Sequence, residues 1–269
     1  MGKSSKKSIA ISGTTGFVGK NLIRLLNHND VEYAILSRTT FQRTRLPKLP
    51  KCLCFVHLIG TGIENVEKNF QEVNVELTKK AIDICKKSKI KKIIYFSGLG
   101  VSKNSTSRYF ISKFKAEQII INSGLNYTIF RPSYIIGKDD YLTKNIQKQI
   151  RKNKIVIPGS GKYIIQPIFI NDVCKIVYLA IKSKKFSKKI IDLVGPEKIS
   201  FKQFLINSIS KSNIKIKKIS LAEAYVKALT DNKFAYGIED LNILLGDFQG
   251  NHEKLRKMSG IKFLKIRNI

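Results

Sequence analysis

Tyr109 and Lys113 are the two residues whose types and spacing best suit proton transfer. They lie four positions apart in the segment RYFISKFKAE, so both side chains project from one face of a helix. A free tyrosine has a pKa of about 10 and exchanges protons near neutral pH only when a neighbouring positive charge lowers that pKa. We therefore predict that the Lys113 ammonium lies beside the Tyr109 hydroxyl as an acid–base pair. A Tyr and a Lys at this spacing are also common on exposed helix surfaces.

A glycine run near the start of the chain is a candidate phosphate-binding turn. In ISGTTGFVGKNL, Gly13 ends an expected strand over residues 8–13, and Gly16 and Gly19 begin an expected helix over residues 17–28. Glycine lets the backbone approach a pyrophosphate, and the free N–H groups of a helix N-terminus attract anionic oxygens. A tight turn without a ligand is the alternative. The residues expected to contact a dinucleotide are Gly13, Thr15, Gly16, Phe17, Val18 and Gly19.

The end of the second expected strand, residues 31–38, indicates which dinucleotide is bound. A site that prefers NAD usually has Asp or Glu there to hold the ribose hydroxyls. This chain has Ser37 and Arg38, and a guanidinium binds a 2′-phosphate through charge-assisted hydrogen bonds. We predict that NADP(H) is favoured over NAD(H), with Arg38 as the main determinant and Arg43 or Arg45 as helpers. A solvated arginine at a strand end is the alternative.

The elements that must position these residues alternate regularly. Strands are expected over 8–13, 31–38, 52–60, 90–98 and 126–137, and helices over 17–28, 70–88 and 108–123. This order predicts an α/β fold, a Rossmann-type doubly wound parallel sheet. The pattern loosens after about residue 138. We expect one chain unit over 1–269, with a core nucleotide-binding domain over 8–137 and mainly a small C-terminal substrate lobe over 138–269.

The composition is that of an ordinary globular protein except for its charge. Hydrophobic residues make up 43% and charged residues 26% of 269 positions. No apolar run approaches the roughly 18 residues of a membrane helix, and no apolar segment follows the lysines of MGKSSKKS, so we expect a cytoplasmic protein. The net charge of +31 permits a nucleic-acid partner or peripheral contact with an anionic membrane, although compositional bias toward Lys, Ile and Asn explains it more simply.

The cysteines and histidines give no metal-binding pattern. The cysteines follow neither a disulfide framework nor a zinc spacing, and the histidines are far apart. We expect reduced core cysteines, a packed strand histidine at His57 and no metal. The residues concerned are Cys52, Cys54, Cys85, Cys174, His28, His57 and His252.

The segments SGTTGFVGKNL, FVHLIG, YFSGLGV, RYFISKFKAE and FRPSYIIG occur in the order typical of one superfamily. With them the chain resembles an extended or atypical short-chain dehydrogenase/reductase of the NAD-dependent epimerase/dehydratase kind. SGLGVSKNSTSRYFISK and DLVGPEKISFKQFL are most similar to the branch that contains the nucleotide-binding accessory subunit of respiratory complex I. The resemblance covers nearly the whole chain. It implies that residues 164–196 return to the sheet after a first excursion into the lobe.

The resemblance also implies roles for individual residues. In the enzymes that the chain resembles, the residues matching Tyr109 and Lys113 exchange a proton with the substrate oxygen while nicotinamide transfers hydride. The lysine also contacts the nicotinamide ribose. Further cofactor contacts are implied at Ile59, Gly60 and Ser97.

Two departures from the family pattern bear on activity. Leu99 stands where the enzymes have a Ser or Thr that donates a hydrogen bond to the substrate oxygen, and losing such a donor costs about 10² to 10³ in rate. The family inserts a helix and a third strand where this chain has the short, proline-rich segment 39–51, so we expect a truncated sheet edge.

Three functions follow as hypotheses. The first is an NADP(H)-binding reductase or epimerase that acts on an unidentified small molecule through Tyr109 and Lys113. The second is a catalytically weak, cofactor-binding accessory or assembly protein of a membrane redox complex. The third is an RNA-binding protein on the same fold, which the charge permits but no recognition motif supports.

Overall fold

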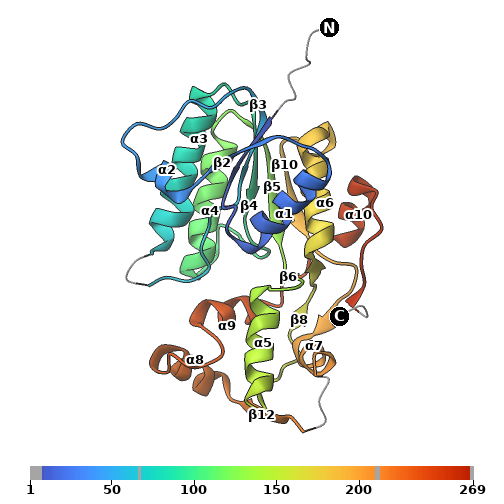
Figure 1. Cartoon of the computed structure of the whole chain (residues 1–269). Helices are drawn as coiled ribbons and strands as arrows, with labels where there is room; N and C mark the ends of the chain where they lie inside the picture. The colour runs from blue at the N-terminus through green and yellow to red at the C-terminus, as the bar shows by residue number, and fades with distance from the viewer. Residues whose placement is uncertain (1–7, 66–67, 210–212, 267–269) are drawn as a thin grey trace.

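One parallel sheet forms the centre of the molecule. The computed structural model describes residues 8–65, 68–209 and 213–266. Six strands pair in the order β10-β5-β4-β3-β1-β2, all parallel (Figure 1). They are β1 (Ser8–Ser12), β2 (Tyr33–Leu36), β3 (Cys52–His57), β4 (Lys92–Phe96), β5 (Asn126–Pro132) and β10 (Lys189–Leu193). Because the strand order reverses at β1, the carboxyl ends of β1 and β3 flank a topological switch point, where such sheets bind ligands.

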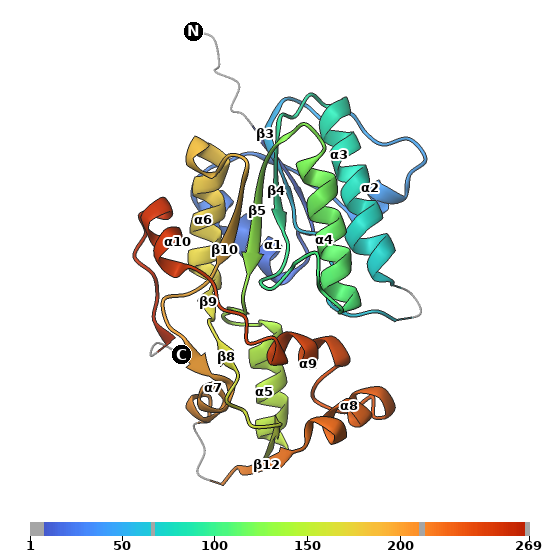
Figure 2. The same ribbon diagram turned by 180° about the vertical axis from the view of Figure 1, so that it is seen from behind.

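Helices cover both faces of the sheet (Figures 1 and 2). One face packs against α1 (Phe17–His28) and α6 (Ile170–Lys182), and the other against the π-helix η1 (Gln71–Glu76), α3 (Leu77–Lys87) and α4 (Arg108–Ile121). Alternate residues of a strand point to opposite faces, so Ile9 and Ile11 enter the first core and Ala10 enters the second. This arrangement confirms the doubly wound sheet that the sequence predicts.

The sheet ends early on the side of β2. Between β2 and β3 the chain forms only the short helix α2 (Arg38–Gln42) and an extended stretch. Among the described residues no further strand pairs with β2, and Ile35 on this edge is 55% exposed. Pro47 and Pro50 each lack the backbone N–H that a new strand would need for pairing. The shortened third-strand region predicted from the sequence is therefore confirmed.

Most of the remaining elements form a lobe at the carboxyl edge of the sheet, with its own apolar core (Figure 1). The chain enters the lobe after β5 and leaves it as α6 and β10, which rejoin the sheet, and a last helix packs beside β10. Short strand pairs β6–β9, β7–β12 and β8–β11 brace the lobe. The elements of the lobe are β6 (Ile135–Ile136), α5 (Tyr141–Arg151), β7 (Lys154–Pro158), β8 (Ile164–Ile165), β9 (Ile168–Phe169), β11 (Ile199–Ser200), α7 (Phe201–Asn207), β12 (Lys215–Ile219), α8 (Leu221–Thr230) and α9 (Ile238–Leu245). Two further elements, η2 (Lys184–Phe186) and α10 (His252–Ser259), pack against the sheet core that also contains α6.

A buried ion pair fixes α4 against β5. The guanidinium of Arg131 donates from Nε to Oε1 of Glu117 at 2.9 Å and from Nη2 to Oε2 at 2.6 Å. The Glu117 side chain is completely buried, so its charge is compensated by this bidentate contact, which also raises the pKa of Arg131. Glu117 lies one turn after Lys113, and the pair therefore also fixes the part of α4 that carries the predicted site.

Replacing Arg131 with methionine should leave a buried, unpaired carboxylate. We expect the free energy of unfolding to fall by about 3–5 kcal/mol, because breaking one side of a buried pair strands the other charge. Urea denaturation followed by circular dichroism measures it, since the chain has no tryptophan. The double variant Glu117→Gln with Arg131→Met should recover much of the loss. A loss below about 1 kcal/mol, typical of exposed pairs, would contradict the assignment.

Candidate cofactor and substrate site

The turn between β1 and α1 is closely packed backbone. Gly13 has φ +76°, and a Cβ there would lie 2.7 Å from the carbonyl carbon of Leu58 at the end of β3. A Cβ at Gly19 would overlap the carbonyl oxygen of Gly13. These two glycines are therefore needed for the turn itself, with or without a ligand. Gly16 is different, because it adjoins the exposed Thr15, and among the described atoms a Cβ on it would meet only the Gly13 oxygen, at 3.3 Å.

The N-terminus of α1 is available to an anion. Gly16 is the N-cap residue, and no side chain of the described residues caps the helix. Its first turn, which begins with Phe17 and Val18, has no acidic residue. The positive end of the helix dipole therefore meets no carboxylate of its own helix. This is the environment in which a helix N-terminus binds phosphate oxygens.

Ser37 and Arg38 lie at the end of β2, beside the end of β1. The Ser37 hydroxyl contacts the hydroxyl of Thr39 at 2.7 Å. Arg38, Arg43 and Arg45 are exposed, and within the described chain they form no ion pair. Three guanidinium groups therefore follow the edge strand without acidic partners.

The ends of β3 and β4 carry the other predicted cofactor contacts. Ile59 is buried and Gly60 is exposed just beyond β3, and a Cβ at Gly60 would lie 2.8 Å from the Nζ of Lys113. Ser97 follows β4 and is 4% exposed. The structure thus brings the glycine turn, the end of β2, these residues and α4 to one edge of the sheet.

Lys113 is buried at this edge, with 5% of its surface exposed. Its Nζ donates to the carbonyl oxygen of Phe96 at 3.0 Å and to the hydroxyl of Tyr95 at 3.3 Å, and it lies over the Tyr95 ring. Burial lowers the pKa of Lys113 to about 8, and the nearby Glu117 carboxylate opposes that change. The ammonium is thus held in place by β4 and not by α4.

The predicted acid–base pair is not formed as a direct contact between the described side chains. The Lys113 ammonium bonds to Tyr95 and Phe96, whereas the Tyr109 hydroxyl lies beside Gly98. Desolvation, with a smaller contribution from the Glu239 carboxylate, raises the pKa of Tyr109 to about 12. A lowering of the Tyr109 pKa by Lys113 is not seen, because the ammonium is bound by β4 instead, and the roles of the two residues in proton transfer stay a prediction.

The Tyr109 side chain instead lines a cavity of about 340 Å³ between the sheet and the lobe, which we call the Tyr109 cavity. Its wall is mostly apolar and includes no lysine or arginine of the described chain, while Asp240 supplies a carboxylate that accepts a hydrogen bond from the Tyr141 hydroxyl at 3.0 Å. Burial raises the pKa of Asp240. The lining residues are Ser97, Gly98, Leu99, Tyr109, Phe110, Pro132, Ser133, Tyr134, Ile135, Tyr141, Ile164, Ile165, Asp240, Ile243 and Phe248.

Leu99 lines this cavity. It occupies the position where the resembled enzymes have a Ser or Thr hydroxyl, so the side chain there donates no hydrogen bond. Its backbone N–H donates to the carbonyl of Pro132 at 2.9 Å, which fixes the loop. Ser102 is exposed, bonded to Ser105, and outside the cavity wall. Ser97 does line the cavity, and its buried Oγ has no hydrogen-bond partner in the described part of the chain. Ser97 therefore places a hydroxyl without a hydrogen-bond partner among the described residues in the wall that Tyr109 also lines.

Two buried polar residues support the site from behind. His57 is completely buried, bonded through Nδ1 to the Ser12 hydroxyl at 2.8 Å, and burial lowers its pKa to about 3, so it is a neutral packed histidine as expected. Asn74 accepts from the N–H of Thr61 at 2.9 Å and donates to the hydroxyl of Ser112 at 2.9 Å. It therefore ties the loop after β3 to α4.

The described residues contain neither a metal-binding cluster nor a helix that could cross a membrane. Among the described residues there is no group of three or more His, Cys, Asp and Glu side chains that could hold a metal ion. The four cysteines are free thiols, and three of them are buried. No helix in the described ranges is both long and apolar enough to cross a membrane.

Sequence reasoning missed Tyr95, Tyr141 and Asp240. Tyr95 occupies a buried strand and reads as core, and nothing local shows that its hydroxyl meets Lys113. At Asp240 the local signal is a carboxylate in the first turn of α9 that accepts from the N–H of Gly237, which predicts a cap and not a cavity wall. Tyr141 lies on α5, 99 residues before Asp240 in the chain, and no motif links them.

Fold and site together define a Rossmann-type protein of the dinucleotide-binding class. The profile of the NAD dependent epimerase/dehydratase family matches residues 9–193, and the chain belongs to this family. A relative is NADH dehydrogenase (ubiquinone) 1 alpha subcomplex subunit 9, mitochondrial, from Arabidopsis thaliana, which is 26% identical over 73% of this chain. The match spans 56% of that relative's length. The predicted branch resemblance is confirmed.

Solved structures support the fold. A nucleoside-diphosphate-sugar epimerase from Staphylococcus aureus superposes with a TM-score of 0.73 at 16% identity, covering 96% of this chain and 97% of that one. MoeE5 in complex with UDP-glucuronic acid and NAD gives a TM-score of 0.65 at 14% identity, covering 91% and 94%. At these identities the likeness concerns the fold.

The buried Lys113 should make stability depend on pH. Its pKa of about 8 in the folded chain lies below the ordinary 10.5, so the unfolded chain binds more protons between these values and stability rises with pH across that window. We expect the unfolding free energy of the wild type, relative to Lys113→Met, to rise by roughly 3 kcal/mol from pH 8 to 10.5. Chemical denaturation at several pH values measures the difference.

Lys115→Met provides the matched control, because Lys115 is exposed on the same helix. Its stability curve should stay parallel to that of the wild type. If the Lys113→Met curve is parallel as well, the ammonium is not buried as described.

Proposed function

We propose that the protein binds NADP(H) along the carboxyl edge of its sheet and serves as an accessory protein of a membrane-bound redox complex, with the cofactor mainly stabilising the fold. The observation that carries this proposal is a difference between two parts of the site, because the part suited to binding phosphate is intact and the part suited to proton transfer is not. The phosphate-binding half is open and free of acidic side chains in the first turn of its helix, whereas the acid–base half has Leu99 in place of a donor and Lys113 bonded to Tyr95.

The exposed part of the glycine turn and the N-terminus of α1 would hold the pyrophosphate. Gly13 and Gly19 shape that turn, while Thr15, Gly16, Phe17 and Val18 would present it to the ligand. Ser37 and Arg38 lie where an adenosine ribose is bound in such folds, and the guanidinium favours a 2′-phosphate. Ile59, Gly60, Ser97 and Lys113 would contact the nicotinamide half. A bound nicotinamide supplies hydride transfer.

The accessory role is supported by the relatives and by the chemistry of the site. The Arabidopsis relative is named as a subunit of a mitochondrial NADH dehydrogenase. Tyr109, with its pKa raised to about 12, is a weak acid and is almost entirely protonated near neutral pH. A site that binds a cofactor but exchanges protons poorly fits a structural role better than rapid turnover, and such a ligand stabilises the folded state.

Calorimetric titration of the protein with NADPH and NADH tests the cofactor. We expect NADPH to bind more tightly, and Arg38→Ala to weaken NADPH by about 10- to 100-fold without changing NADH, because charge-assisted hydrogen bonds to the 2′-phosphate are lost. Arg151→Ala, an exposed arginine in the lobe, should change neither affinity. Equal affinities for both cofactors that Arg38→Ala leaves unchanged would overturn the NADP(H) preference, and absence of binding would overturn the proposal.

A second candidate function is slow reduction of a small, uncharged carbonyl compound. The apolar Tyr109 cavity favours it, because its wall holds Tyr109 and the unpartnered Ser97 hydroxyl but, among the described residues, no cation for a phosphate-bearing substrate. Here Tyr109 would pass its proton to the carbonyl oxygen, and the apolar cavity wall would exclude water.

Two variants separate these functions in cells that carry the protein. Gly16→Val should prevent cofactor binding and reduce the amount of the redox complex on native gels, whereas Tyr109→Phe should leave that amount unchanged, because the Tyr109 hydroxyl lies beside Gly98 and away from the glycine turn. Gly62→Ala is the control for the added side chain, since a Cβ there meets no atom of the described residues within 4 Å. Unchanged complex with Gly16→Val would exclude the accessory role, and turnover that Tyr109→Phe abolishes would favour the reductase.

A further inference from the structure

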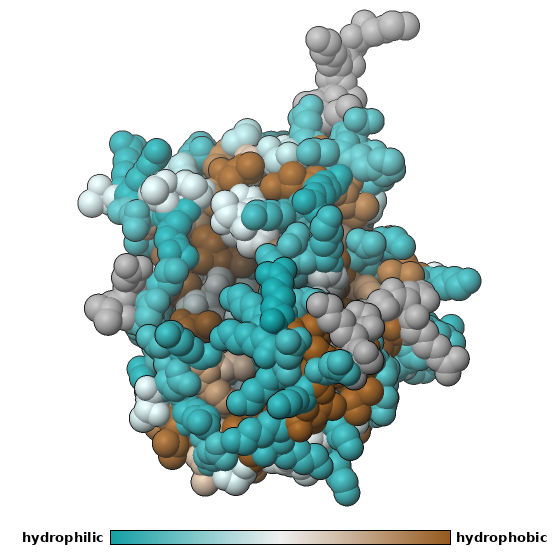
Figure 3. Space-filling model, turned by 60° about the horizontal axis from the view of Figure 1, so that its bottom comes forward, coloured by the Kyte–Doolittle hydropathy of each residue, from teal (hydrophilic) through white to brown (hydrophobic). Residues whose placement is uncertain are grey.

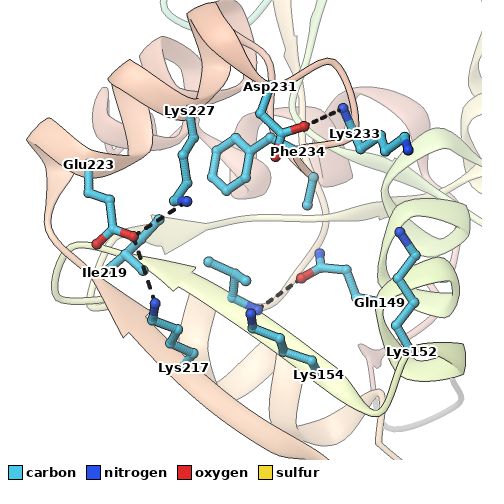
Figure 4. A pocket seen from close by; sticks show the side chains of 12 residues that line it. Gln149, Lys152, Lys154, Lys217, Ile219, Glu223, Lys227, Asp231, Lys233 and Phe234 are labelled. Carbon is cyan, nitrogen blue, oxygen red and sulfur yellow. Dashed lines mark hydrogen bonds and ion pairs between the residues drawn. The ribbon is translucent and has the colours of Figure 1, made fainter.

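A second, chemically different pocket lies at the end of the lobe that is far from the sheet (Figures 1 and 4). It is formed by the C-terminal end of α5, one face of the β7–β12 pair, α8 and the loop that follows α8. Its volume is about 200 Å³. We call it the lysine pocket, and it is lined by Gln149, Lys152, Lys154, Val156, Lys217, Ile219, Glu223, Lys227, Asp231, Lys233, Phe234 and Ala235. It shares no residue with the glycine turn or the Tyr109 cavity.

Strand register explains why lysines face this pocket. In the parallel pair β7–β12, Lys217 is opposite Val156, and Lys154 lies two residues before Val156 on the same face. The alternate residues Ile155 and Ile157 are completely buried in the lobe core. The apolar residues of the KIVIP segment thus anchor the strand, while its alternation turns Lys154 toward the pocket.

The wall is a fixed structure, because buried polar groups hold it. Gln149 is 7% exposed, and its side-chain oxygen accepts from the N–H of Val156 at 2.9 Å. The Tyr236 hydroxyl donates to the carbonyl of the same residue at 2.7 Å. These contacts join β7 to α5 and to the segment before α9. The backbone segments that carry the lysines are therefore held in place around the pocket, as a preformed rim.

The charges of the pocket do not balance. Lys217 and Lys227 share the single carboxylate of Glu223, at 3.8 and 3.7 Å. The second lining carboxylate, Asp231, accepts a hydrogen bond from the backbone N–H of Lys233 at 2.9 Å (Figure 4). The side-chain ammonium groups of Lys152, Lys154 and Lys233 form no ion pair within 4 Å in the described chain, so five lysines face two carboxylates. Five of twelve lining residues are lysines, whereas lysine and arginine together make up 50 of 269 residues, so this density is about twice the average of the whole chain.

An adjoining hollow extends the basic surface along α5. It shares Lys152 and Lys233 with the lysine pocket and adds Lys144 and Lys148. Lys144 is paired with Asp139, and Lys148 has no ion pair among the described residues. Figure 3, in which this end of the molecule comes forward, shows a largely hydrophilic face with hydrophobic patches between the hydrophilic residues.

We propose that the lysine pocket binds a ligand that carries two or more phosphate groups. Several ammonium groups around one concavity repel each other, and a multiply charged anion relieves that repulsion at several points together. Lysine suits this task as a flexible point charge for phosphate. Phe234, Val156 and Ile219 supply apolar lining, so an organic group attached to the phosphates could pack against these side chains. A phosphorylated lipid headgroup and a free polyphosphate share this chemistry.

The outward side of α8 offers a means to tell these two sources apart. Val226 is 58% and Leu229 is 70% exposed on this helix, and neither lines the pocket. Exposed apolar side chains beside a basic site insert into a bilayer surface but contribute nothing to binding a soluble polyphosphate.

Calorimetric titration with sodium tripolyphosphate tests the site. The triple variant Lys152→Gln, Lys154→Gln, Lys233→Gln removes the lysines without ion pairs, and at about fivefold per ammonium we expect a loss of affinity of roughly 100-fold. The triple variant Lys91→Gln, Lys115→Gln, Lys184→Gln removes the same charge from positions elsewhere on the molecule and should lose much less. Equal losses in the two variants would overturn the proposal, because binding would then follow net charge alone.

Co-sedimentation with phosphatidylcholine vesicles, with and without a phosphoinositide, identifies the source. Binding that requires the phosphoinositide, is lost in the pocket variant and weakens with Val226→Ser and Leu229→Ser supports a lipid headgroup. Tripolyphosphate binding without vesicle binding supports a soluble ligand. Tighter binding of a single-stranded RNA oligonucleotide, lost in the same pocket variant, would replace the proposal with an RNA-binding face. Circular dichroism verifies that each variant is folded.

Discussion

The close packing of the turn after β1 against the end of β3 is the constraint on which the rest of the site depends. Gly13 adopts a left-handed conformation against Leu58, and Gly19 lets α1 start directly above the Gly13 carbonyl. A side chain at either position would push α1 away from the sheet. Because α1 is held there, its N-terminus faces the switch point between β1 and β3, and the ends of β2, β3 and β4 converge on the same edge.

Lys113 links this edge to α4, and its position separates it from Tyr109, with which it was predicted to form an acid–base pair. Its ammonium is bound by Tyr95 and the Phe96 carbonyl and lies close to Gly60, which suits contact with a ligand along the sheet edge. Tyr109 faces the apolar cavity under the lobe, where desolvation keeps its proton. Helix α4 therefore places the Lys113 ammonium at the sheet edge and the neutral Tyr109 hydroxyl in the wall of the Tyr109 cavity. The two side chains that were predicted to act together therefore face different surroundings.

The two ends of the lobe differ in charge. Its end toward the sheet closes the Tyr109 cavity with apolar residues and Asp240, and its far end gathers lysines on a preformed rim. Lysines are spread along helices such as α3, whereas Lys152, Lys154 and Lys233 come from different segments and surround one concavity. The fold thus places part of the net charge of +31 around this pocket.

Periodicity and glycine spacing determined the sheet, its helices and the tight turn after the first strand, because those features follow from local conformation and from which face of an element is apolar. The shortened edge after β2 was equally readable, since residues 39–51 are too few and too rich in proline for another unit. The partner of Lys113 was not, because a helical spacing of four gives a shared face but not the direction of a long, flexible side chain. Only the tertiary structure decided that β4 captures the ammonium, and that Lys154, Lys217 and Lys233, far apart in the chain, surround one pocket, since both depend on which strands the core brings together.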